Sequence, residues 1–326
     1  TLTFGENSDV NGLIHLAAGT VNMTFNGTQD ELSIKTEQQK NYGNTSNPTN
    51  CASLEVNMTL DKGANITLAD RQGNTYESVN IADGKLTASI WHDATEYGEK
   101  KEQLQNDNKF KAVTVGEKGI FNITKLNSGG STDQTSAEAK PHTQLLIKDM
   151  KLNLDGGALQ VAGQNYTGAL KVGMSSESGA DTLTINAGNY NFESLKVGNA
   201  TNNVVTVAGG SLTVGDVEIK GQRHGKLALT GGTTTVNGSF TTVQGAIELN
   251  GGTLVTAGSN LFAKGEGADA EYATTDAWKH VTATKGVVEL TDTGFEYSLA
   301  DLITEDYPPV YFWYGRDDLT LNLLCW

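Results

Sequence analysis

The chain is poor in cysteine, proline and arginine, and each shortage excludes something. Cys51 and Cys325 are its two cysteines, and they form neither a disulfide framework nor a metal-binding motif. With three arginines and a formal net charge of −15, the chain lacks the basic surface that nucleic-acid binding requires. Four prolines against 38 glycines do not suit a disordered linker. We therefore expect an ordered protein without a nucleic-acid partner.

Long apolar runs and catalytic motifs are also missing. No run approaches the roughly 20 residues of a membrane helix, so we expect no direct membrane insertion of this fragment. Nucleophile elbows, zincin motifs, phosphate-binding loops and EF-hands are absent. The histidines are scattered, at His15, His92, His142, His224 and His280. We predict no enzyme, no catalytic, cofactor-binding or metal-ligating residue, and no cofactor.

What the chain does contain is a repeat centred on a pair of small residues. The copies are "LNLDGGALQV" (152–161), "LTINAGNYNF" (183–192), "VTVAGGSLTV" (205–214), "LALTGGTTTV" (227–236) and "IELNGGTLVT" (247–256). The first residue of the pair falls at Gly156, Ala187, Gly209, Gly231 and Gly251, at intervals of 31, 22, 22 and 20. A second phrase is interleaved, as "ALKVG" (169–173), "SLKVG" (194–198), "SLTVG" (211–215) and "SFTTV" (239–243).

Each unit of this repeat has the periodicity of β-strands, because its apolar residues alternate. In "LALTGGTTTV" we expect Leu227, Leu229 and Val236 to face the core. Gly231 and Gly232 should turn the corner at positive φ, and Thr233–Thr235 should face water or a partner. A constant period near 22 residues favours stacked coils of short strands, that is, an all-β parallel β-helix, or solenoid. An antiparallel sandwich or a prism with glycine-rich turns is the alternative.

The pattern weakens outside 150–260, where polar stretches without periodicity interrupt it. We predict surface insertions near 27–50, 92–110, 127–142 and 265–278. The β-helix should therefore cover residues 1–306. Residues 307–326 concentrate aromatics and prolines, and are expected to be a cap, a junction to a further segment or a non-native tail. In such a coil Cys51 and Cys325 lie several tens of ångströms apart, too far for a disulfide.

The stretch 150–299, with its "LxLxGGxLxV" phrase and its Thr/Asn/Gly texture, resembles the passenger region of AIDA-type bacterial autotransporters. It is also similar to other type V-secreted adhesins. The resemblance implies a right-handed β-helix that is secreted and displayed at the cell surface, on the outer membrane. It carries no catalytic signature.

These observations lead us to expect a non-enzymatic adhesin or self-association module that acts through many weak contacts along a rod. Its partner would be a host-surface protein, a glycan or a second copy of itself. Two alternatives stay open. One is a glycan-active β-helix enzyme, such as a polysaccharide lyase, a hydrolase or a phage-type depolymerase. The other is a purely structural stalk.

Overall fold

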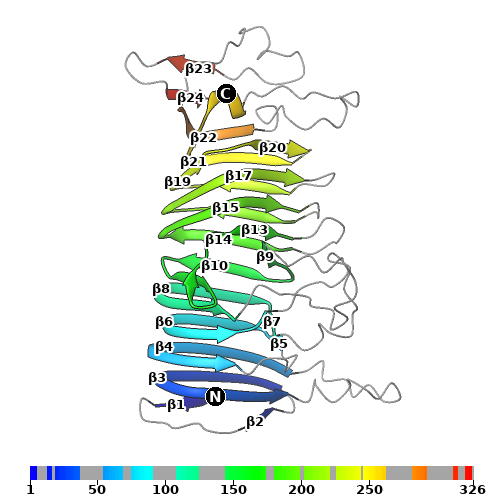
Figure 1. Ribbon diagram of the computed structural model, residues 1–326, viewed down its shortest axis with the longest axis vertical. Coiled ribbons are helices and arrows are strands. Elements are labelled where there is room, and N and C mark those ends of the chain that lie inside the picture. Colours follow the sequence, from blue (N-terminus) through cyan, green and yellow to red (C-terminus); the bar gives the residue numbers. More distant parts are fainter. Residues whose placement is uncertain are drawn as a thin grey trace, which may run out of the picture. The chain divides into compact units, whose positions relative to one another are not determined.

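The computed structural model describes residues 1–5, 13–16, 19–36, 54–68, 75–90, 108–124, 144–173, 180–198, 202–220, 225–243, 245–261, 281–291, 311–314 and 320–324. These residues are mostly β-strand (Figure 1). They belong to two compact units, Thr1–Tyr166 (unit 1) and Thr167–Trp326 (unit 2).

Unit 1 is dominated by parallel strands. These are β1 (Leu2–Phe4), β2 (Leu13–Leu16), β3 (Gly19–Thr36), β4 (Leu54–Leu68), β5 (Thr75–Tyr76), β6 (Ser78–Ala88), β7 (Lys109–Phe110), β8 (Ala112–Ile123), β9 (Gln144–Ile147), β10 (Lys151–Asp155), β11 (Ala158–Val161) and β12 (Gln164–Asn165). The long strands pair in the order β3–β4–β6–β8, all parallel, and both β10 and β11 continue this sheet on β8. Only the short β11–β12 pair is an antiparallel hairpin among the described strand pairs of unit 1. Parallel pairing contradicts the antiparallel sandwich.

Apolar residues of unit 1 stack from strand to strand on the buried face. Met23, Met58, Val79, Val113 and Leu152 occupy one register position on successive strands, and all are at most 2% exposed. Aromatic rings extend this core: Phe4 lies on Phe25 with ring centroids 4.7 Å apart. Burial of apolar area is the main favourable term in folding, and such ladders bury every second residue.

Unit 2 repeats the same arrangement with shorter strands. They are β13 (Ala169–Val172), β14 (Thr182–Ala187), β15 (Asn189–Val197), β16 (Val204–Val207), β17 (Ser211–Lys220), β18 (Lys226–Leu229), β19 (Thr233–Val236), β20 (Phe240–Val243), β21 (Ala246–Thr256), β22 (Val281–Leu290), β23 (Tyr311–Tyr314) and β24 (Thr320–Leu324), with the short helix α1 (Gly258–Leu261). The chain visits three columns of parallel strands in turn. The first column is β14–β16–β18–β21, and the second is β15–β17–β19–β21. The third is β13 and the later halves of β15 and β17, followed by β20.

The strand register of unit 2 reproduces the sequence period. Asn189 pairs with Ser211, Ser211 with Thr233 and Thr233 with Thr253, at offsets of 22, 22 and 20 residues. These offsets equal the last three intervals between the small-residue pairs. The predicted core positions Leu227, Leu229 and Val236 are at most 1% exposed, so this prediction is confirmed.

The paired glycines have two separate tasks. Gly232 has φ +65°, in the left-handed region, so it makes the predicted corner. Gly231 has no such φ; instead, a Cβ at Gly231 would overlap the backbone carbonyl oxygen of Ala208, which follows the paired strand β16. Gly209 stands in the same relation to the carbonyl oxygen of Asn186. A Cβ at Gly232 would also overlap backbone atoms of Gly209 and Gly210. Gly232 is therefore required both by its conformation and by the close approach of two backbones, and Gly231 by the close approach alone.

Two expectations about the repeat need correction. Strand β3 continues to Thr36, so the first part of the predicted insertion 27–50 is strand, where Glu31 pairs with Thr67 and Leu32 with Leu68. This stretch is polar, so its composition resembles that of a surface loop rather than that of a strand. The phrase "SLTVG" (211–215) also belongs to the second column rather than the third, because Ser194 pairs with Asp216. In "DVEIK" (216–220) the buried Val217 and Ile219 keep the alternation, while Asp216 stands at the register position of the small Ser194.

Other predicted segments are described in part or not at all. Of 92–110, residues 108–110 are described and include β7; residues 37–50, 92–107, 127–142 and 265–278 lie outside the described residues. Within 307–326, β23 and β24 pair antiparallel, and β24 pairs antiparallel with β22. The assignment of this segment as a cap, a junction or a tail stays a prediction.

Thr234 is an exception to the prediction that the threonines face outward. It is 0% exposed and in register with the buried Leu212 and Leu254, and its hydroxyl has no hydrogen-bond partner. A buried unpaired hydroxyl retains its desolvation cost. Thr233 and Thr235, one residue away on either side, are half-buried on the opposite face.

Replacing Thr234 with valine should therefore raise the free energy of unfolding by about 1 kcal/mol, because the shape is kept and the unpaired hydroxyl is removed. Chemical denaturation of T234V against the parent chain measures this. The matched control is T235V, which should change stability by less than about 0.5 kcal/mol. A destabilised T234V would show that the hydroxyl has a stabilising role.

Candidate functional site

The outward face of the second column in unit 2 carries two parallel rows of uncharged polar side chains. One row is Asn189, Ser211, Thr233 and Thr253; the other is Asn191, Thr213 and Thr235, and ends at Val255. All eight residues are half-buried or exposed. Strands in a sheet lie about 4.8 Å apart, so each row presents one polar group per strand at that spacing. We call this surface the unit 2 polar rows; Figure 1 shows β15, β17 and β19 one after another.

The side chains in these rows are partly ordered by one another. The Ser211 hydroxyl donates to Asn189 Oδ1 at 2.7 Å. Threonine, serine and asparagine each offer both a donor and an acceptor. The unit 2 polar rows therefore retain hydrogen-bonding capacity toward a partner, and they contain no charged side chain.

Unit 1 has a corresponding ladder on β3, β4 and β6. Asn57 Nδ2 donates to Asn22 Oδ1 at 2.9 Å, and the Ser78 hydroxyl donates to Asn57 Oδ1 at 2.6 Å. We call Asn22, Asn57 and Ser78 the unit 1 ladder. A second row beside it places Thr24, Thr59, Asn80, Thr114 and Asn153 in register on five strands.

Ion pairs also connect neighbouring strands. Lys196 pairs with Glu218 at 3.2 Å and Lys226 with Glu248 at 3.0 Å in unit 2, and Lys111 pairs with Glu77 at 2.6 Å in unit 1. Their side chains are between a quarter and three-fifths exposed. Exposed pairs of this kind contribute about 0–1 kcal/mol. The pairs therefore fix the local arrangement of charge more than they stabilise the fold.

The sequence singled out no site residue, and few of the residues it discussed can be placed. His15 lies in β2 opposite Lys35 of β3. His92, His142, His224, His280, Cys51 and Cys325 lie outside the described residues. Among the residues that the structure describes, no three or more His, Cys, Asp or Glu side chains gather where they would hold a metal ion. No helix in this part of the chain is long and apolar enough to cross a membrane.

The unit 1 ladder was not among the predictions from the sequence, although the sequence contains a signal for it. "VNMTF" (21–25) and "VNMTL" (56–60) are nearly identical, and the structure pairs them residue for residue. The offset of 35 residues differs from the period of 22, so the match escapes a search at constant period. An insertion after a strand lengthens the offset without disturbing the register.

Comparison of the chain with protein-family models, with curated proteins and with solved structures found no match.

Proposed function

We propose that each unit is a segment of right-handed parallel β-helix. The three columns of unit 2 and the offsets of 20–22 residues between paired strands support this proposal. Crossover connections between parallel strands are right-handed in nearly all proteins, which favours the right-handed form. The chain would then be a passenger fragment of an autotransporter-type protein that is secreted and displayed at the bacterial outer surface.

We further propose that the chain is a non-enzymatic adhesin whose main partner is a second copy of itself. The observation that carries this proposal is the pair of uncharged polar rows on unit 2. Because every Asn, Ser and Thr is both donor and acceptor, two copies of the same surface are complementary to each other. Each hydrogen bond contributes little, about 0.5–1.5 kcal/mol, so association depends on many contacts made together. Host-surface proteins and glycans are the other partners that such a surface suits.

Net charge opposes this association. Two chains of charge −15 repel each other, and the uncharged rows are a place where they approach with the smallest local repulsion. Salt screens the repulsion over about 8–10 Å at physiological ionic strength. We therefore expect self-association to strengthen as salt is raised from about 10 mM to about 150 mM.

The test places one lysine in the middle of the rows. Thr213→Lys brings two ammonium groups together when two copies meet, and like charges across an interface are strongly unfavourable. We expect the dissociation constant for self-association, measured by sedimentation equilibrium, to rise by about tenfold or more. The added lysine also lowers the net negative charge, which by itself would weaken the repulsion between two chains and favour association. A loss of association would therefore come from the local repulsion between the two lysines.

The matched control is Thr241→Lys. Thr241 is half-buried on β20 in the third column of unit 2, opposite Glu218, and outside the polar rows. T241K makes the same change of charge and should associate like the parent chain. A parent chain that stays monomeric at high concentration would contradict self-association and favour a passive stalk. Equal weakening by both variants would assign the effect to net charge rather than to the rows.

A further inference from the structure

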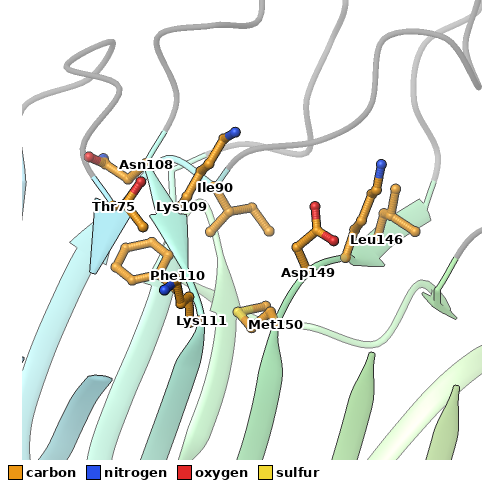
Figure 2. A pocket seen from close by; sticks show the side chains of 10 residues that line it. Thr75, Ile90, Asn108, Lys109, Phe110, Lys111, Leu146, Asp149 and Met150 are labelled. Carbon is orange, nitrogen blue, oxygen red and sulfur yellow. The ribbon is translucent and has the colours of Figure 1, made fainter. Parts of the chain in front are cut away.

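Unit 1 contains a cavity of about 120 Å³ that is lined by residues of β5, β7 and β9, among others (Figure 2). Lys109, Lys111 and Lys148 line this cavity, and each of them already has an interaction within the chain. Asn108 also lines it, but this residue is 0% exposed and its Oδ1 atom is enclosed. We therefore assign no ligand to the cavity.

In unit 2, the corner in the middle of β21 carries an asparagine that is followed directly by glycine. Both residues of this pair, Asn250 and Gly251, are exposed. Gly251 has φ +139°, and a Cβ on it would lie 2.8 Å from the carbonyl oxygen of Thr230. Other residues rarely adopt this conformation, so the fold itself favours glycine after Asn250.

A hydrogen bond holds the side-chain amide of Asn250 at this corner. The Thr284 hydroxyl of β22 donates to Asn250 Oδ1 at 2.6 Å. The pairing of β21 with β22 is irregular here, with register shifts on both sides of Asn250. A donor on this oxygen stabilises the negative charge that develops there when a nucleophile attacks the amide carbon. Thr284 is thus placed to activate Cγ of Asn250.

We propose that Asn250 is a site of spontaneous deamidation, with the backbone nitrogen of Gly251 as the nucleophile. Solvent hydroxide removes the proton from this nitrogen, which then forms a bond to Asn250 Cγ. The bond between Cγ and Nδ2 breaks, and Nδ2 takes a proton from water and leaves as ammonia. Water then opens the resulting cyclic imide, and no group is oxidised or reduced.

The opening of the imide gives two products. Attack of water on the side-chain carbonyl leaves aspartate at position 250, and attack on the backbone carbonyl leaves isoaspartate. Isoaspartate adds a methylene to the main chain of β21, ahead of the residues that pair with β19. Both products add one negative charge. This modification site goes beyond the proposed self-association and does not depend on it.

Asn186 provides a comparison for the role of the glycine. It is exposed at the corresponding corner of the first column, because the preceding residues Ile185 and Leu249 belong to one register row. The residue that follows Asn186 is Ala187. The Cβ of this alanine hinders the approach of its backbone nitrogen to the amide carbon, so Asn186 should react slowly.

Asn237 provides a comparison for the role of the backbone. It is exposed and, like Asn250, is followed by glycine. The N–H of Gly238 donates to the carbonyl oxygen of Gly215 at 2.7 Å. This hydrogen bond has to open before the nitrogen of Gly238 attacks, so the structure should protect Asn237.

The test is to incubate the full chain in mildly alkaline buffer and to follow each asparagine by peptide mapping. Mass spectrometry identifies the deamidated peptides, and chromatography separates aspartate from isoaspartate. We expect Asn250 to convert at least about tenfold faster than Asn186 and Asn237. Conversion of Asn250 at the rate of either comparison residue, or no conversion at all, would overturn the proposal.

The variant Thr284→Val tests the activating hydrogen bond. Thr284 is exposed, so T284V should keep the fold while it slows conversion of Asn250 by about threefold or more. The matched control is Thr241→Val, which makes the same change on β20 and should convert like the parent chain. Unchanged or faster conversion in T284V, or equal slowing in T241V, would show that Thr284 does not activate Asn250.

Discussion

Replacing Gly231 with alanine should destabilise unit 2 by at least about 3 kcal/mol, or prevent its folding. The added Cβ would overlap the carbonyl oxygen of Ala208, which is a backbone atom and therefore cannot move away by a change of rotamer. The same backbone contact recurs between Gly209 and Asn186, so relaxation at one contact would disturb the next. Hydrogen exchange of the amides of β16 and β18 measures the loss, because these strands flank the site.

Gly63 supplies the control for this effect. It has φ +74° and nothing within 4 Å of the position that a Cβ would occupy. G63A should therefore cost only the conformational strain of a left-handed alanine, about 1–2 kcal/mol. A G231A chain as stable as the parent would show that the two backbones do not approach as closely as the structure has them.

Replacing Ile247 with alanine is the second substitution with a large expected effect, a loss of about 3 kcal/mol in the free energy of unfolding. Ile247 is 0% exposed, and its register neighbour Leu227 in β18 is also buried. Truncation leaves a cavity between stacked side chains, and the neighbouring strands β18 and β22 cannot close it without breaking their backbone pairing with β21. Chemical denaturation followed by circular dichroism measures the change.

The adjacent residue of the same strand gives the contrast. Glu248 faces outward and pairs with Lys226 at 3.0 Å, and both side chains are about one-third exposed. Solvent screens such a pair, so E248A should cost no more than about 0.5 kcal/mol. If I247A and E248A had similar effects, the alternation of buried and exposed residues along β21 would be wrong.

The repeating part of the fold follows from the sequence because its cause is local. Alternating residues such as Leu227 and Leu229 fix which face of a strand is buried, and a constant period fixes which strands pair. The glycine corner was predicted from the tolerance of glycine for positive φ. The close approach of Gly231 to Ala208 does not follow from the local sequence, because it depends on two segments of the chain rather than on one.

The predictions of burial and of strand boundaries failed where a polar residue occupies a strand position. Thr234 lies inside although its type suits either face, and the second half of β3 pairs with β4 although its composition resembles a loop. β-Propensity measures how a side chain fits its neighbours, and those neighbours lie on other strands. These neighbouring residues cannot be identified from a single sequence before the strand pairing is known.

The candidate surfaces were less predictable than the fold. The unit 1 ladder joins residues 35 and 21 positions apart, since insertions of different length separate its strands. Surfaces assembled from several strands can be identified only once the strand register is known.

The strand register of unit 2 brings the residues of the polar rows together, and a distance across the polar rows tests this register directly. Spin labels at Asn189 and Thr253, in a chain with Cys51 and Cys325 replaced by serine, mark the two ends of one row. Three parallel strand spacings separate these positions, so pulsed electron resonance should give a narrow distribution corresponding to about 15 Å between the two backbone sites. A broad distribution, or one centred beyond about 30 Å, would contradict the parallel register and with it the polar rows.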